Sequence, residues 1–117
     1  MINWTPLDSE QALRDLVQAS YETPCLILKH STTCPISSMA KYRLEDDWKF
    51  GTEEVTPFYL DLLRHRSLSN LIAETFSVHH ESPQVILVRN GESDYDSSHL
   101  DISVGEVAEQ LERLAQS

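Results

Sequence analysis

The stretch "KHSTTCPIS", residues 29–37, joins two kinds of sequence pattern. The apolar run "CLIL" lies directly before it and has the length of a strand that is buried on both faces. After Cys34, apolar residues recur every four positions and predict a helix that stops at Gly51: Ile36, Ala40, Leu44 and Trp48. The stretch therefore predicts a buried strand that leads into a helix, with Cys34 at the junction.

Cys34 is the candidate reactive residue because of where the predicted helix begins. If Pro35 is the first helical residue, Cys34 is the N-cap and Ser37 is the third residue of the first turn. The sulfur then faces the unpaired N–H groups of Ile36 and Ser37, with the Ser37 hydroxyl as a further donor. These donors and the positive end of the helix dipole favour a thiolate. We expect a solvent-accessible, nucleophilic sulfur.

The neighbours of Cys34 add to this expectation. Thr33 directly precedes it, and Lys29 and His30 would add positive potential that favours a thiolate. The alternative is that Cys34 is an inert buried cysteine, which is the commoner state of this residue. Cys25 is expected in that state. About five residues of strand place it roughly 16 Å from Cys34, whereas a disulfide needs Cα atoms within roughly 7 Å.

The remaining patterns alternate between helix and strand. A polar start at Asp8 or Ser9 precedes an amphipathic helix, Asn90-Gly91 is a strong hairpin signal, and Ser103 begins the last helix. The alternation predicts one α/β domain, residues 1–117, with a mixed sheet covered by helices on both faces. The expected order is a helix within 5–22 that begins after Asp8 or Ser9, strand 24–30, a helix from 35 to the stop at 51, strand 55–63, helix 67–76, strand Gln84–Arg89, a partner strand within 93–102 and helix 103–116, with an optional short strand at 2–4.

The composition argues against several classes of partner. Nineteen acidic against nine basic residues give a formal charge of −10, whereas nucleic-acid binding depends on clustered Lys and Arg. No apolar run is long enough to cross a bilayer, and the N-terminus lacks the features of a signal peptide. Two cysteines exclude a disulfide framework and a four-sulfur metal site within one chain. We expect a cytoplasmic monomer with no bound metal and no nucleic-acid or membrane partner.

A second candidate feature is Pro83 in "HESPQVILVRNGE", residues 80–92. A proline is tolerated at the start of a strand, and strand punctuation alone explains it. A cis Ser82–Pro83 peptide bond is the alternative and is uncommon unless the fold requires it. If the fold brings this segment next to Cys34, His80 and Glu81 would lie near the cleft at that cysteine and could assist proton transfer or hold polar groups of a ligand. The simpler interpretation of these two residues is a solvated loop histidine beside a glutamate.

Together, the two motifs resemble those of the YtxJ family, the monothiol bacilliredoxins, and the element order resembles the thioredoxin fold over essentially the whole chain. The resemblance implies that Cys34 is the active cysteine, that Ser37 takes the place of the second cysteine of dithiol relatives, and that Pro83 is a cis-proline facing the sulfur. The implied substrate is a mixed disulfide between a client protein and the low-molecular-weight thiol bacillithiol. Bacillithiol would be a co-substrate, not a tightly bound cofactor, and the backbone of Ser82 could pair with client or thiol.

Three other functions stay open at this point. Monothiol glutaredoxins, which also carry Cys-x-x-Ser, hold an iron–sulfur cluster between two subunits, and Cys34 could donate one thiolate to such a cluster. A mononuclear metal site would combine Cys34 with His30, His79 or His80, although the spacing matches no standard ligand pattern. A binding module of the same fold, with the thiol idle, is the third.

Overall fold

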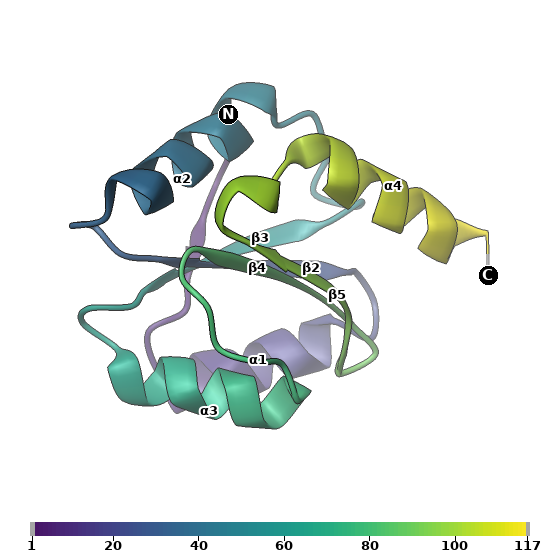
Figure 1. Cartoon of the computed structure of the whole chain (residues 1–117). Helices are drawn as coiled ribbons and strands as arrows, with labels where there is room; N and C mark the ends of the chain where they lie inside the picture. Colours follow the sequence, from purple (N-terminus) through teal and green to yellow (C-terminus); the bar gives the residue numbers. More distant parts are fainter. Residues whose placement is uncertain (1, 117) are drawn as a thin grey trace.

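The computed structural model describes residues 2–116, and in this part of the chain it contains a five-stranded mixed sheet (Figure 1). The strand order is β1-β3-β2-β4-β5. β1 and β2 both run parallel to β3, whereas β4 is antiparallel to both β2 and β5. The strand bounds are Thr5–Pro6 for β1, Cys25–His30 for β2, Thr56–Asp61 for β3, Gln84–Arg89 for β4 and Glu92–Ser98 for β5.

Helices cover both faces of this sheet, as the sequence predicts. α1 and α3 lie on one face and α2 and α4 on the other (Figure 1). None of these helices has the length and apolar character needed to cross a bilayer. Their bounds are Glu10–Ala19 for α1, Pro35–Asp47 for α2, Arg66–Phe76 for α3 and Val104–Ala115 for α4, and a short 3-10 helix, η1, spans His99–Asp101.

β2 is the central strand and is buried along its whole length. Side chains alternate between the two faces of a strand. Cys25 and Ile27 accordingly pack in the core formed with α1 and α3, whereas Leu26 and Leu28 pack in the core formed with α2 and α4. This confirms the interpretation of "CLIL" as a strand buried on both faces, and it fixes which face each later residue of the strand meets.

Several local signals are confirmed. Ser9 is the N-cap of α1, and its hydroxyl accepts a hydrogen bond from the Ala12 N–H. Ser103 caps α4 in the same way. Asn90 and Gly91 both have positive φ, 54° and 76°, as the predicted hairpin turn between β4 and β5 requires.

Two boundaries were wrong. α2 ends at Asp47, before the expected stop at Gly51, because Trp48 adopts an extended backbone and packs edge-on against Phe50 with ring centroids 5.0 Å apart. The optional N-terminal strand lies at Thr5–Pro6 instead of 2–4, where it pairs with Phe58 and Tyr59. The first difference comes from aromatic packing and the second from strand pairing with a distant part of the chain, and local periodicity reports neither.

Candidate active site

Cys34 lies in the connection between the end of β2 and the start of α2, at the end of the sheet that is on the left of Figure 1. It is the N-cap of α2, with extended backbone angles of φ −103° and ψ 118°, and Pro35 begins the helix. Its carbonyl accepts the Ser38 N–H at 3.0 Å, and its own N–H donates to the Ser31 carbonyl at 3.2 Å. The residue is half-buried. The predicted N-cap position is therefore confirmed.

The expected side-chain contact between Ser37 and the sulfur was wrong. The Cys34 side chain makes no capping hydrogen bond. The Ser37 hydroxyl is fully buried and instead lies 2.6 Å from His30 Nδ1 and accepts the Ser31 N–H at 2.9 Å. Ser37 thus ties the loop before Cys34 to the end of β2. We call this arrangement of His30, Ser31 and Ser37 the Ser37 latch.

His30 does not supply the positive potential that was expected of it. Burial, and secondarily the nearby charge of Lys41, lower the pKa of this imidazole, against smaller opposing effects of Ser37, Asp61 and Glu45. The neutral ring therefore predominates near pH 7.

Lys29 lies on the opposite face of the sheet from His30. Its side chain is fully buried, and Nζ donates to the Ser69 carbonyl in α3 at 3.2 Å and lies 3.2 Å from His80 Nδ1. Burial lowers the pKa of this lysine to about 8. Lys29 was predicted to be a supporting cation, but neither its burial nor its contact with Ser69 was predicted. The strand pattern could have indicated burial, since Lys29 continues an apolar run that is buried on both faces.

The Ser82–Pro83 peptide bond is cis. Lys29 pairs with Gln84 in the antiparallel register of β2 and β4, so Pro83 lies at the sheet edge from which the chain continues to Cys34. The Pro83 carbonyl accepts the His99 N–H at 3.0 Å. Ser82 directly precedes this proline and is half-buried, and within residues 2–116 its buried hydroxyl oxygen has no hydrogen-bond partner.

Side chains from three elements hold the segment that leads to this proline. Gln84 is fully buried, and its amide donates to the His79 carbonyl at 2.9 Å. The Glu81 carboxylate lies between His79 Nε2 at 3.6 Å and His99 Nε2 at 3.5 Å. His80 is exposed overall, although its Nδ1 edge faces Lys29. These contacts of Gln84, His79 and His99 were not predicted, because no local signal in the sequence points to contacts made at this end of the sheet.

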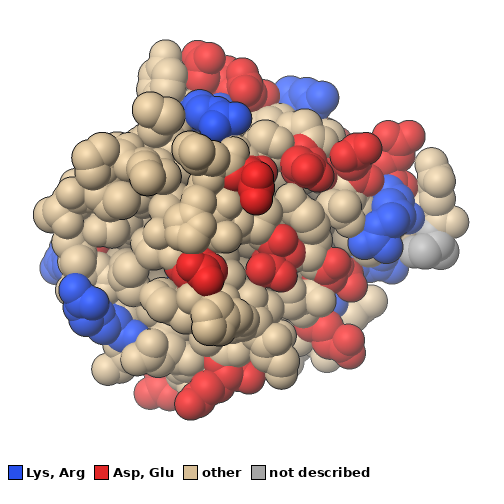
Figure 2. Space-filling view, viewed as in Figure 1, with Lys and Arg blue, Asp and Glu red and all other residues tan. Residues whose placement is uncertain are grey.

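Exposed side chains around the start of α2 are mostly uncharged. Residues 31–40 contain no charged side chain although the chain carries a net charge of −10. Figure 2 shows the same contrast, with few charged groups on the left, where α2 begins, and many acidic ones on the right. Ile36, which was expected on the buried face of the helix, is 44% exposed, and Met39 is 55% exposed. Ile36 belongs to the first turn of α2, at the end of the helix where Cys34 lies.

Cys25 is the buried apolar residue that the sequence predicts. It has no exposed surface, packs in the core between β2, α1 and α3, and its thiol contacts the carbonyl oxygens of Leu16 and Thr23 at 3.8 and 3.5 Å. Burial raises the pKa of this thiol to about 11. Cys25 and the segment bearing Cys34 stand at opposite ends of β2.

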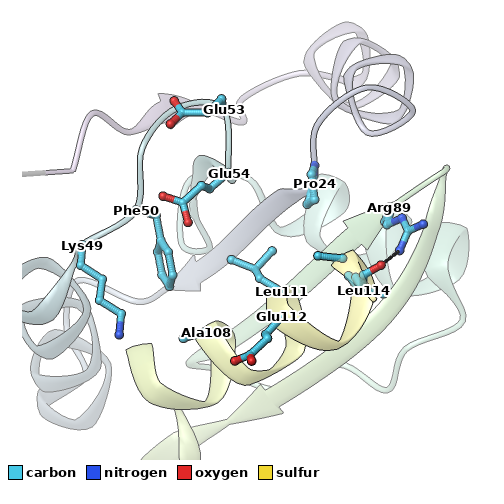
Figure 3. Close-up of a pocket in the computed structure, with 11 residues that line it drawn as sticks. Pro24, Lys49, Phe50, Glu53, Glu54, Arg89, Ala108, Leu111, Glu112 and Leu114 are labelled. Carbon is cyan, nitrogen blue, oxygen red and sulfur yellow. Dashed lines mark hydrogen bonds between the residues drawn. The ribbon is translucent and has the colours of Figure 1, made fainter. Parts of the chain in front are cut away.

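One hollow on the surface lies away from both cysteines. Its volume is about 640 Å³, and it opens between α4 and the loop that carries Phe50 (Figure 3). Pro24 and Arg89 line it, which places it at the sheet edge opposite Cys34. Within residues 2–116, no three His, Cys, Asp or Glu side chains converge to hold a metal ion.

The comparisons with known proteins agree with this geometry. A solved structure described as a candidate oxidoreductase with a thioredoxin fold has 32% sequence identity and a TM-score of 0.75, and the match covers 90% of each chain. Thioredoxins from Malassezia sympodialis (10% identity, TM-score 0.75, covering 97% of this chain and 91% of that one) and Trypanosoma brucei brucei (15%, 0.74, 98% and 93%) share the fold. Residues 5–107 match the family model described as monothiol bacilliredoxin BrxC. The chain therefore belongs to the monothiol bacilliredoxin family, a family of thiol oxidoreductases with the thioredoxin fold.

Proposed function

We propose that this protein reduces mixed disulfides between bacillithiol and client proteins, with Cys34 as the nucleophile. The observation that carries the proposal is the contrast between the two sulfurs. Cys34 is partly accessible at a helix N-terminus, at the sheet edge that also carries the cis-proline, whereas Cys25 is enclosed in the core. Thiol exchange requires a sulfur with access to a disulfide, and of the two cysteines only Cys34 has that access.

The reaction we propose is a single exchange. The Cys34 thiolate attacks the bacillithiol sulfur, a new disulfide forms between Cys34 and bacillithiol, and the bond between bacillithiol and the client breaks. The client leaves as a thiolate and takes a proton from solvent. A second small thiol then attacks the Cys34 adduct, which releases a bacillithiol-containing disulfide and restores the Cys34 thiolate.

An external thiol is needed because the chain offers no resolving sulfur near Cys34. Ser37, at the resolving position of dithiol relatives, carries a hydroxyl that is engaged with His30 and Ser31. Cys25 stands at the other end of β2. We propose that the client or thiol pairs with the backbone of Ser82, a half-buried residue directly before the cis-proline.

Intact mass spectrometry tests this proposal directly. The purified protein is mixed with a bacillithiol-modified client, and transfer of the bacillithiol mass is followed for the wild type, Cys34→Ser and Cys25→Ala. We expect a single adduct on Cys34, no transfer in Cys34→Ser and wild-type transfer in Cys25→Ala. An adduct on Cys25 would overturn the assignment. Absence of transfer in the wild type, together with normal client binding by Cys34→Ser, would instead support a binding module.

A further inference from the structure

Lys29 is a buried cation beneath the segment that leads to the cis-proline. Its polar contacts are the neutral Ser69 carbonyl and the His80 ring. Within residues 2–116 it forms no ion pair with a carboxylate. A buried charge is normally paired, because removal from water is costly. An uncompensated ammonium next to a substrate-binding segment is therefore a feature that calls for a negatively charged partner.

The contact with Lys29 determines which His80 nitrogen carries the proton. An ammonium group can only donate, so His80 Nδ1 must accept, and the neutral ring must carry its proton on Nε2. The pKa of Lys29, about 8, leaves this ammonium mostly protonated at neutral pH. Nε2 lies on the other side of the ring from Lys29, His80 is exposed, and no hydrogen bond to Nε2 occurs in the described part of the chain.

The other groups around His80 do not change which ring nitrogen carries the proton. From α3, the Ser69 hydroxyl lies 3.4 Å from the same Nδ1 atom. Burial first, and then the charges of Lys29 and His79, lower the pKa of His80, while Glu81 opposes them. Glu81 is itself flanked by His79 and His99. The neutral imidazole with its proton on Nε2 therefore predominates at neutral pH.

We propose that His80 Nε2–H binds a carboxylate oxygen of the small thiol that is linked to the client, and that Lys29 is the positioning residue that fixes this donor. The inference rests on the proposed function and adds the recognised group. His80 lies three residues before the cis-proline, on the segment against which the ligand is placed. A carboxylate there would compensate the Lys29 charge through the imidazole, and hydrogen bonds to charged acceptors are the stronger class.

Nitrogen-15 NMR of the histidine rings tests the positioning role without any reaction. In the wild type at pH 7, His80 should show a protonated Nε2 and an unprotonated Nδ1. In Lys29→Met, which keeps an apolar side chain of similar length, the tautomers should mix and the His80 pKa should rise, because a nearby positive charge is removed. An unchanged tautomer and pKa in Lys29→Met would overturn the positioning role.

Matched probes test the recognition of a carboxylate. A client thiol is modified with 3-mercaptopropionic acid or with 3-mercaptopropionamide, which have the same size but differ in charge. The wild type should react at least about ten-fold faster with the acid, mainly through KM. His80→Leu should lose this preference, His80→Gln, which keeps an outward N–H donor, should retain part of it, and His79→Gln should keep it.

The outcomes separate the two proposals. Equal rates with acid and amide, while bacillithiol is still transferred to Cys34, would overturn the carboxylate site alone. No transfer from any of the three thiols would overturn the proposed function, and the carboxylate site with it. If His79→Gln lost the preference for the acid and His80→Leu retained it, His79 would be the recognition residue and the proposed role of His80 would be wrong.

Discussion

The two ends of β2 are equally buried but chemically opposite. Cys25 lies at one end in an apolar core, and burial raises the pKa of its thiol to about 11. Lys29 and His30 lie at the other end, buried on opposite faces of the sheet, and each contacts a polar partner. Burial alone therefore does not distinguish the apolar end of β2 from the polar end. The difference lies in what the buried groups contact.

The polar end uses its buried groups to hold two loops. The Ser37 latch secures the loop before Cys34, while Lys29 contacts His80 in the segment before the cis-proline. A buried polar group without a partner costs roughly 1–3 kcal/mol, so these contacts hold each loop in one arrangement. The apolar end has no such requirement, because its side chains need only fill space.

The largest expected difference between the two ends is in the reactivity of the sulfurs. At pH 7.5, iodoacetamide should modify Cys34 in Cys25→Ala at least about 1,000-fold faster than Cys25 in Cys34→Ser, because Cys25 reacts only when the core opens. The rates are measured by intact mass. Reaction in urea is the control and should be equally fast for the two cysteines. Equal alkylation rates of Cys34 and Cys25 in the folded variants would mean that Cys25 is not enclosed.

Lys29→Met should make the polar end resemble the apolar one and raise the free energy of unfolding. Burial lowers the lysine pKa from 10.5 to about 8, which corresponds to about 3 kcal/mol at neutral pH. Between pH 8 and 10.5 the folded wild type loses this proton while the unfolded chain keeps it, so wild-type stability rises and the advantage of the variant shrinks. Urea unfolding at pH 7 and pH 10 measures the free energy of unfolding of the wild type and of Lys29→Met. A difference in favour of the variant that grows with pH would contradict the buried-charge explanation.

Ser37→Ala breaks the latch and should lower the free energy of unfolding by about 2 kcal/mol, because the Ser31 N–H and His30 Nδ1 lose a buried partner. Attack by Cys34 should also slow, since the loop before it is no longer tied to β2. Ser38→Ala is the matched control, an exposed serine in the same helical turn. Equal stability of the two variants by urea unfolding would show that the latch is not a stabilising contact.

The smallest effect is expected at the apolar end. Cys25→Ala removes one buried sulfur atom and should lower the free energy of unfolding by about 1 kcal/mol, with no change in the rate of transfer to Cys34. Chemical unfolding and the mass assay measure these two quantities separately. A clear drop in transfer rate, with stability intact, would mean that the two ends of β2 are coupled.

Much of the frame could be predicted from the sequence. The apolar run before His30 predicted the central strand, Pro35 predicted where α2 begins, and Asn90-Gly91 predicted the hairpin. These signals are local, since the residues that make them determine their own backbone conformation. The end of α2 and the position of β1 were missed because they involve contacts between distant residues, of Trp48 with Trp4 and of Thr5 with Phe58.

The amino-acid pattern alone was enough to predict that one cysteine caps a helix next to a buried strand and that the other fills the core. The contacts of the polar residues of that strand could not be predicted in this way, because they depend on how the chain folds. Lys29 meets Ser69 and His80, which are 40 and 51 positions away in the chain. The physical reason is that periodicity reports which face a side chain takes, whereas a hydrogen bond depends on which distant segment the fold brings to that face.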